Sequence, residues 1–263
     1  MAVALAFVGL ASRRTRAACR LFYKFHRWSQ AATGSIAGRM LKIVVAVAAV
    51  LVLAVFGAAA SLRFIDPPGS RLMALREAEG VTVRRSWVPL ESVSPDLIEA
   101  VIVHEDPRIC THWGVDWPRI RSAVDEAENG APEDTSTIAM QTVKNLVLWP
   151  ERSYLRKGLE IPLAYALVLM VPRRRVVEIY LNIAEWGPGV FGIHAAAAHH
   201  FAKTPDALTA SESALLAAAL PNPHVRNAGR AGPRTRALAR RIGERVRART
   251  GLAQCILSGE RKR

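Results

Sequence analysis

Two adjacent carboxylates, Glu105 and Asp106, stand at the end of an apolar segment and directly before Pro107. Apolar residues at 97–103 recur at helical spacing, which predicts a buried helix that carries both carboxylates to the start of a loop. A carboxylate held in this way can act as a general base, because such catalysis needs a fixed proton acceptor beside the reacting group. Taken alone, the same pattern also fits a helix that simply ends in solvent.

A second polar group lies on a predicted helix at 136–148 and comprises Ser136, Gln141, Lys144 and Asn145. These side chains leave the helix without a clean apolar face. Polar clustering on an otherwise apolar helix indicates that the helix lines a cleft.

Three cations and one acid follow within nine residues: Arg152, Arg156, Lys157 and Glu160. A guanidinium fork and an ammonium group together suit a diphosphate. The alternative is a helical i,i+4 ion pair between Arg156 and Glu160, which stabilises a helix by only a few tenths of a kcal/mol.

The elements that must position these side chains are mostly helical. Apolar periodicity predicts further helices at 117–128, 155–170, 173–184, 190–201 and 209–219, the last with a capping box of Thr209 and Glu212. One short strand or hairpin is expected at 81–90. Residues 187–192 spell G-x-G-x-x-G, but Pro188 lies inside the motif and no strand is predicted before it. We therefore expect a sharp interhelical turn there and no organic cofactor.

Residues 43–62 form a run of twenty residues without a charge. A helix of that length can cross the hydrocarbon layer of a membrane, so we expect one transmembrane anchor rather than a cleaved signal peptide. Residues 1–42 carry eight Lys or Arg and no acid, and by the positive-inside rule this predicts a cytoplasmic N-terminus. Met40 could also be the natural start, since the span would still be complete.

The net charge of +14 is unevenly distributed. The two ends of the chain are strongly basic, whereas residues 63–223 are mildly acidic, so the folded part offers no obvious basic face for nucleic acid. We expect four segments: a basic segment at 1–42, the span at 43–62, a catalytic domain at 63–225, and a basic tail at 226–263 with a solvated helical face.

Three cysteines, Cys19, Cys110 and Cys255, are too few and too scattered to indicate a pairing. No C-x-x-C motif is present, which argues against a redox or zinc site. We expect all three to be unpaired, although Cys110 and Cys255 would both lie on the outer side, where a bridge is permitted.

Five ordered segments carry a resemblance to a known family: 104–116, 136–149, 152–160, 178–197 and 210–223. They resemble the signatures of the bacterial peptidoglycan glycosyltransferases of glycosyltransferase family 51, the glycosyltransferase domain of class A penicillin-binding proteins. The resemblance covers about residues 66–225. No serine is followed by lysine three positions on, so we expect no transpeptidase domain.

The resemblance implies a mainly α, lysozyme-like domain at the outer face of the plasma (inner) membrane. It would polymerise lipid II into β-1,4-linked glycan strands for the cell wall and release undecaprenyl diphosphate. By matching position, Glu105 would be the catalytic base and Glu160 the second acid. The predicted substrate contacts are Asp106, His112, Ser136, Thr137, Gln141, Lys144, Asn145, Arg152, Arg156, Lys157 and Asn182.

The resemblance also implies Mg²⁺ or Mn²⁺ shared with the substrate diphosphate, because the sequence contains no dedicated metal ligands of its own. The implied partners are lipid II, the growing glycan strand, membrane lipids and other wall-synthesis or division proteins. Asp134 and Thr135 stand where the family has a glycine pair, which predicts a stiffer, more negative loop.

Two other functions remain open on the sequence alone. A lysozyme-like enzyme that cleaves glycans would also use carboxylates, but it has no need for the cations at 144–157. A membrane scaffold for wall-synthesis partners would need no catalytic base at all.

Overall fold

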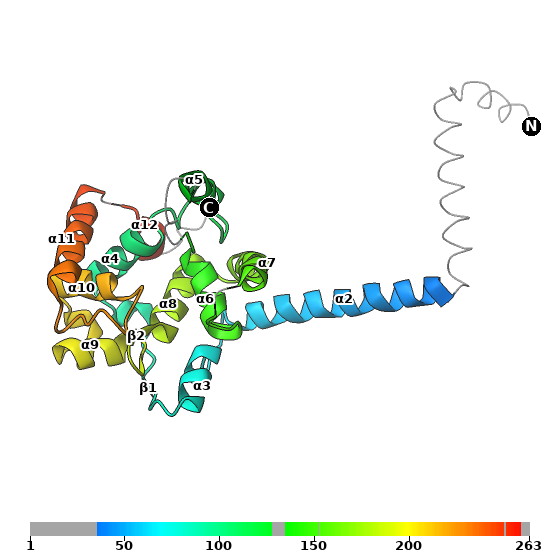
Figure 1. Cartoon of the computed structure of the whole chain (residues 1–263), viewed down its shortest axis with the longest axis horizontal. Helices are drawn as coiled ribbons and strands as arrows, with labels where there is room; N and C mark the ends of the chain where they lie inside the picture. The colour runs from blue at the N-terminus through cyan, green and yellow to red at the C-terminus, as the bar shows by residue number, and fades with distance from the viewer. Residues whose placement is uncertain (1–35, 128–134, 152, 250, 259–263) are drawn as a thin grey trace, which may run out of the picture. The chain divides into compact units, whose positions relative to one another are not determined.

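The computed structural model describes residues 36–127, 135–151, 153–249 and 251–258. The chain divides into two units, residues 1–54 and 55–263. Helices predominate among the described residues, in agreement with the predicted fold class (Figure 1). The helices of more than three residues are α2 Ile36–Ser61, α3 Arg71–Ala78, α4 Pro95–Glu105, α5 Trp117–Ala127, α6 Ile138–Val147, α7 Tyr154–Met170, α8 Arg173–Ile183, α9 Ile193–Phe201, α10 Ala210–Ala219, α11 Pro233–Ala248 and α12 Gln254–Leu257.

Helix α2 contains 26 residues, and its segment 38–61 is long and apolar enough to cross a bilayer. The helix that we predicted at 43–62 is therefore present, and it begins seven residues earlier because Ile36 to Lys42 continue the same helix. Residues 1–35 of the predicted cytoplasmic segment lie outside the described part of the chain.

Helix α4 forms the centre of the hydrophobic core in the second unit. Its buried positions run almost without a break from Leu97 to Val103, and α10 and α11 both pack against it. Pro95 occupies the first turn, where its missing N–H costs nothing. This burial on several sides holds the C-terminal end of α4, and therefore Glu105, in a fixed position.

Helix α6 packs between two neighbours, α7 and α8. Thr137 is its N-cap, and the Thr137 hydroxyl accepts a hydrogen bond from the backbone N–H of Met140. The predicted capping box of Thr209 and Glu212 is likewise present at the start of α10. The predicted helices at 117–128, 136–148, 155–170, 173–184 and 209–219 are all confirmed to within about two residues at each end.

A three-stranded sheet joins two short segments of the chain, with strand order β1-β3-β2. The strands are β1 Arg84–Arg85, β2 Glu185–Gly187 and β3 Val190–Phe191; β3 runs parallel to β1 and antiparallel to β2. The helix predicted at 190–201 therefore starts only at Ile193, and a strand does precede the glycine-rich segment. That strand, β2, is followed by the antiparallel strand β3, so the segment is a hairpin and not the strand–turn–helix unit of a dinucleotide site. Gly189 makes the turn possible at φ +72°, where a Cβ atom would lie 2.7 Å from the carbonyl oxygen of Thr82.

The C-terminal segment is part of the fold, in contrast to the tail that we expected at 226–263. Helix α11 packs on α10 and α4, and Ala239 and Ile242 on its inner face belong to the hydrophobic core. Its many arginines had suggested a solvated face only. Leu238, Ala239, Ile242 and Val246 nevertheless form an apolar stripe at helical spacing, and burying this stripe explains the docking.

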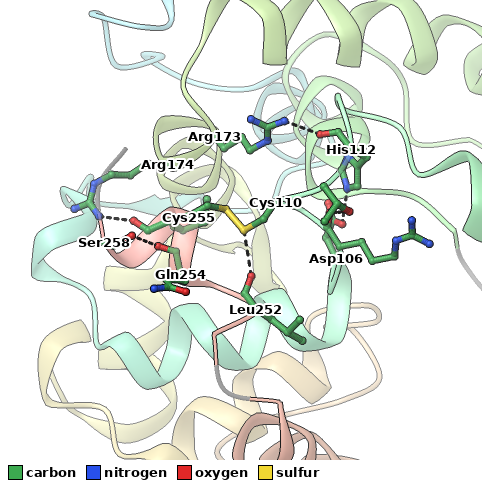
Figure 2. Close-up of a disulfide and its surroundings, with 12 residues drawn as sticks. Asp106, Cys110, His112, Arg173, Arg174, Leu252, Gln254, Cys255 and Ser258 are labelled. Atoms are coloured by element: carbon green, nitrogen blue, oxygen red, sulfur yellow. Dashed lines mark hydrogen bonds and ion pairs between the residues drawn. A yellow bond between two sulfur atoms is a disulfide. The ribbon is translucent and has the colours of Figure 1, made fainter. Parts of the chain in front are cut away.

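Cys110 and Cys255 form a disulfide, so the expectation that they are unpaired is wrong. The bridge connects the loop after α4 to α12 (Figure 2), and the two cysteines are separated by 145 residues in sequence. A hydrogen bond also holds α12, because Arg174 Nη1 on α8 donates to the carbonyl oxygen of Ile256 at 2.8 Å. Such a pairing depends on how α11 returns the chain to α4, which no local pattern reveals.

We expect the double substitution Cys110→Ser/Cys255→Ser to lower the free energy of unfolding by about 2–4 kcal/mol, because the bridge restricts the unfolded chain over a long loop. Urea unfolding of the oxidised protein measures this difference. Cys19→Ser is the control and should leave the urea midpoint unchanged. A double variant as stable as the wild type would show that the disulfide does not stabilise the folded protein.

Candidate active site

A cleft of about 670 Å³ opens beside the C-terminal end of α4. Helices α4, α5, α6 and α11 all contribute to its wall, together with residues of the loop after α10. The side chains that matter for chemistry are Glu105, Arg119, Ser136, Gln141, Lys144, Asn145, Arg226, Arg241 and Arg245. Four of the predicted polar residues, those at 136, 141, 144 and 145, are thus brought together with Glu105.

Glu105 is the last residue of α4, and its side chain is about 10% exposed. Its Oε2 accepts a hydrogen bond of 2.6 Å from Nε2 of Gln141. The amide of Gln141 is itself oriented, because the Tyr180 hydroxyl donates to its Oε1 at 2.9 Å. Arg119 Nη1 also donates to the backbone carbonyl of Glu105 at 3.0 Å. These contacts from three helices fix the carboxylate at the cleft wall, as a general base requires.

His104 lies next to Glu105, with its Nε2 at 4.0 Å from Glu105 Oε1. Burial, together with the positive charges of Arg226, Arg245 and Arg119, lowers the pKa of His104 to about 4. The imidazole is therefore neutral at neutral pH.

We expect wild-type stability to fall relative to His104→Asn as the pH is lowered from about 6.5 to about 4. The folded state holds His104 at a pKa below its ordinary value of 6.5, so protons bind the unfolded chain first and favour it. The full difference is about 3 kcal/mol, from 1.4 kcal/mol per pKa unit. Urea midpoints across this pH range measure it, with the exposed His199→Asn as control. Parallel curves for wild type and His104→Asn would contradict the prediction.

Asp106, His112 and Thr137 do not line the cleft. Asp106 is 1% exposed; its Oδ1 accepts from Nε2 of His112 at 2.8 Å, and its Oδ2 accepts from the N–H of Ile138 at 3.1 Å. Thr137 donates to the carbonyl oxygen of Gly114 at 2.6 Å. This buried network joins the loop after Glu105 to the first turn of α6, so the structure does not bring these three predicted substrate contacts to the cleft wall.

Asn182 is also buried away from the cleft, at 1% exposed. Its side chain pairs with the backbone of Val88, accepting from the N–H at 2.9 Å and donating to the carbonyl oxygen at 2.8 Å. It therefore fastens α8 to the segment after β1 and does not line the cleft.

The residues predicted at the diphosphate do not all lie at one place in the structure. Glu160 is 1% exposed and forms ion pairs with Arg156 and, at 3.1 Å, with Nζ of Lys157. Lys157 Nζ also donates to Ser136 Oγ at 2.6 Å, so the cluster touches the cleft through Ser136. Lys144 lies in the cleft wall itself, while Arg152 lies outside the described residues.

These contacts leave Glu160 poorly suited to hold a metal ion, because two cations already occupy its carboxylate. Within the described ranges, no three His, Cys, Asp or Glu side chains converge as a metal site.

Sequence analysis missed the cations that reach the cleft from outside the predicted motifs: Arg76, Arg119, Arg226, Arg241 and Arg245. Arg76 is paired with Glu185 at 3.2 Å and with Glu79 at 2.8 Å. The apolar stripe of α11 was the signal that could have predicted that this helix, which carries the exposed Arg241 and Arg245, packs on the domain. Nothing local could have indicated that the docked helix borders the same cleft as Glu105.

The family model described as transglycosylase matches residues 72–247, which is well over half of the chain. The chain belongs to the transglycosylase family. The match extends through α11, so the C-terminal helix is part of the transglycosylase domain and not an appendage.

Three similar proteins are each named a biosynthetic peptidoglycan transglycosylase. The relative from Rhodospirillum centenum is 46% identical over 223 residues, covering 83% of this chain and 96% of the relative. The one from Agrobacterium fabrum is 47% identical, covering 75% and 87%, and the one from Brucella melitensis is 44% identical, covering 81% and 94%. The predicted family is therefore confirmed.

Proposed function

We propose that this chain is a peptidoglycan glycosyltransferase that polymerises lipid II into β-1,4-linked glycan strands and releases undecaprenyl diphosphate. The observation that carries the proposal is the carboxylate of Glu105, held by Gln141 in a cleft that contains far more cations than acids. Such a cleft suits a sugar substrate with an anionic leaving group.

In the proposed reaction, Glu105 accepts the proton of the acceptor's 4-hydroxyl group. The hydroxyl oxygen then bonds to the anomeric carbon of the growing strand, and the bond from that carbon to the diphosphate oxygen breaks with inversion. The bonding electrons leave with the diphosphate, whose negative charge therefore grows in the transition state. Lys144, and Lys157 beside Ser136, are placed to stabilise that charge.

A glycan-cleaving enzyme fits the cleft less well. Glycoside hydrolysis needs a second working carboxyl group across the sugar. Glu160 is buried in ion pairs, and Glu185, which does line the cleft, is bound by Arg76 and by His224 at 3.1 Å. Hydrolysis also releases no diphosphate, so it would give Lys144 and Lys157 no leaving group to stabilise.

Full-length protein incubated with labelled lipid II in detergent tests the proposal. We expect long glycan strands and free undecaprenyl diphosphate. Shortening of preformed strands would indicate hydrolysis, and the absence of both reactions would favour a scaffold.

We also propose that Mg²⁺ or Mn²⁺ binds through the substrate diphosphate, because Glu160 is already paired. Polymerisation with EDTA, and then with each metal added back, measures this contribution. Identical rates in all conditions would contradict it.

The proposed orientation places the N-terminus in the cytoplasm and the transglycosylase domain outside. It is supported by the eight basic residues that precede α2 without any acid. Reporter fusions that are active on only one side of the membrane, joined after residue 263, test the orientation.

We expect the domain without its anchor, residues 63–263, to bind anionic vesicles through the start of α7. Tyr154 and Leu155 there are 96% and 68% exposed. Leu155→Glu should weaken vesicle binding about tenfold, since an inserted leucine contributes roughly 1.5 kcal/mol or more. Co-sedimentation measures it, with the exposed Val225→Glu as control. Equal binding by wild type and Leu155→Glu would exclude this surface.

A further inference from the structure

One wall of the cleft consists of arginines from the C-terminal part of the domain. Arg241 and Arg245 lie one helical turn apart on α11, and Arg226 precedes that helix. Among the residues that the structure describes, six Arg or Lys and two Glu line the cleft. Among the described lining residues, Arg76 pairs with Glu185, which leaves Glu105 as the one other carboxylate beside the remaining cations.

These arginines are available to an anion. Among the described residues, the guanidinium groups of Arg241 and Arg245 have no hydrogen bond and no ion pair. Arg226 uses one nitrogen to donate to the carbonyl oxygen of Ala218 at 3.0 Å, which holds its side chain in place. By contrast, Arg236 on the same helix is bound to the carbonyl oxygen of Ala231, and Arg240 lines a different groove.

The charges of this wall converge on the residue next to the base. Arg226 and Arg245 both lower the pKa of His104, whose Nε2 is 4.0 Å from Glu105 Oε1. An anion bound by the arginine wall would therefore sit close to the reacting hydroxyl.

The diphosphate already has its own cations on other elements. Lys144 lies on α6, and Lys157 on α7 reaches Ser136, whereas α11 packs on α4 and α10. Besides its diphosphate, lipid II carries carboxylates on its peptide branch. A guanidinium fork matches the two oxygens of a carboxylate.

We propose that Arg241 and Arg245, together with Arg226, form a subsite for a carboxylate of the substrate's peptide branch. The subsite orients the sugar so that its hydroxyl meets Glu105. This inference rests on the proposed function and adds the group that the enzyme recognises.

The test compares lipid II with free peptide carboxylates to lipid II with those carboxylates amidated. For wild-type protein we expect kcat/KM to be about tenfold higher with the free carboxylates, a typical effect of a charge-assisted hydrogen bond. Arg241→Gln/Arg245→Gln should reduce that ratio to about one. Arg240→Gln on the same helix is the matched control and should keep the wild-type ratio. Thermal unfolding of each variant verifies folding.

A second measurement does not depend on turnover. Full-length protein in detergent is titrated with the soluble disaccharide–peptide, with free or amidated carboxylates. We expect tighter binding of the free form by the wild type and by Arg240→Gln, and equal binding of both forms by the double variant.

The inference is overturned if the wild type does not discriminate between the two forms in either measurement. It is also overturned if the double variant weakens both forms equally, since the arginines would then serve the diphosphate. Polymerisation without carboxylate preference would reject the subsite and keep the proposed function. Selective binding without polymerisation would keep the subsite and reject the proposed function.

Discussion

Glu105→Gln is expected to reduce the rate of glycan polymerisation by a factor of about 10³, within the range that general bases contribute. Glutamine has the shape of glutamate, and its carbonyl oxygen can still accept the hydrogen bond from Gln141. It cannot accept the proton of the attacking hydroxyl at neutral pH. Single-turnover rates with labelled lipid II measure the effect, and the binding of lipid II should change little.

Glu99→Gln is the matched control, because it makes the same change on the same helix away from the cleft. It should polymerise lipid II at the wild-type rate. Wild-type turnover by Glu105→Gln would exclude Glu105 as the base. A loss of turnover accompanied by unfolding would be detected by circular dichroism, and Glu105→Asp would then test the role of the carboxylate in a folded protein.

Glu160→Gln is expected to lower the free energy of unfolding by about 3 kcal/mol, because breaking a buried ion pair leaves uncompensated charge. Glu160 is 1% exposed, and Arg156 beside it is about 10% exposed. The partly exposed Lys157 keeps some access to water, which places the effect at the lower end of the usual range. Urea unfolding measures the difference.

Glu244→Gln on the exposed face of α11 is the control and should change stability by less than about 0.5 kcal/mol. If Glu160→Gln unfolds like the wild type but loses polymerisation, Glu160 has a direct role toward the substrate. The ion-pair network predicts the opposite result, in which Glu160→Gln clearly loses stability.

Much of this fold could be read from local patterns. The apolar run at 97–103 predicted α4 and the position of Glu105 at its end, and both are confirmed. Thr209 and Glu212 predicted the start of α10 through their capping box. These features depend on residues a few positions apart, and such spacing is visible in a linear sequence.

The site could be predicted only in part. The residues at 136, 141, 144 and 145 were expected to line a cleft with Glu105, and they do. Asp106 and Thr137 were expected there as well, yet they are buried among backbone groups of other elements. A polar side chain near a base in sequence can equally satisfy a buried helix end, and burial alone distinguishes the two.

By itself, the sequence determined the helices, the apolar N-terminal segment, the position of Glu105 at the end of its helix and the family resemblance. Each of these depends on local spacing or on ordered motifs. Only the tertiary structure decided that Cys110 pairs with Cys255 and that Arg241 and Arg245 line the same cleft as Glu105. Both results follow from the docking of α11 on α4 and α10. That docking comes from burial of an apolar stripe against the preceding helix α10 and against α4, which is more than a hundred positions away. Local spacing does not show which distant surface will cover such a stripe.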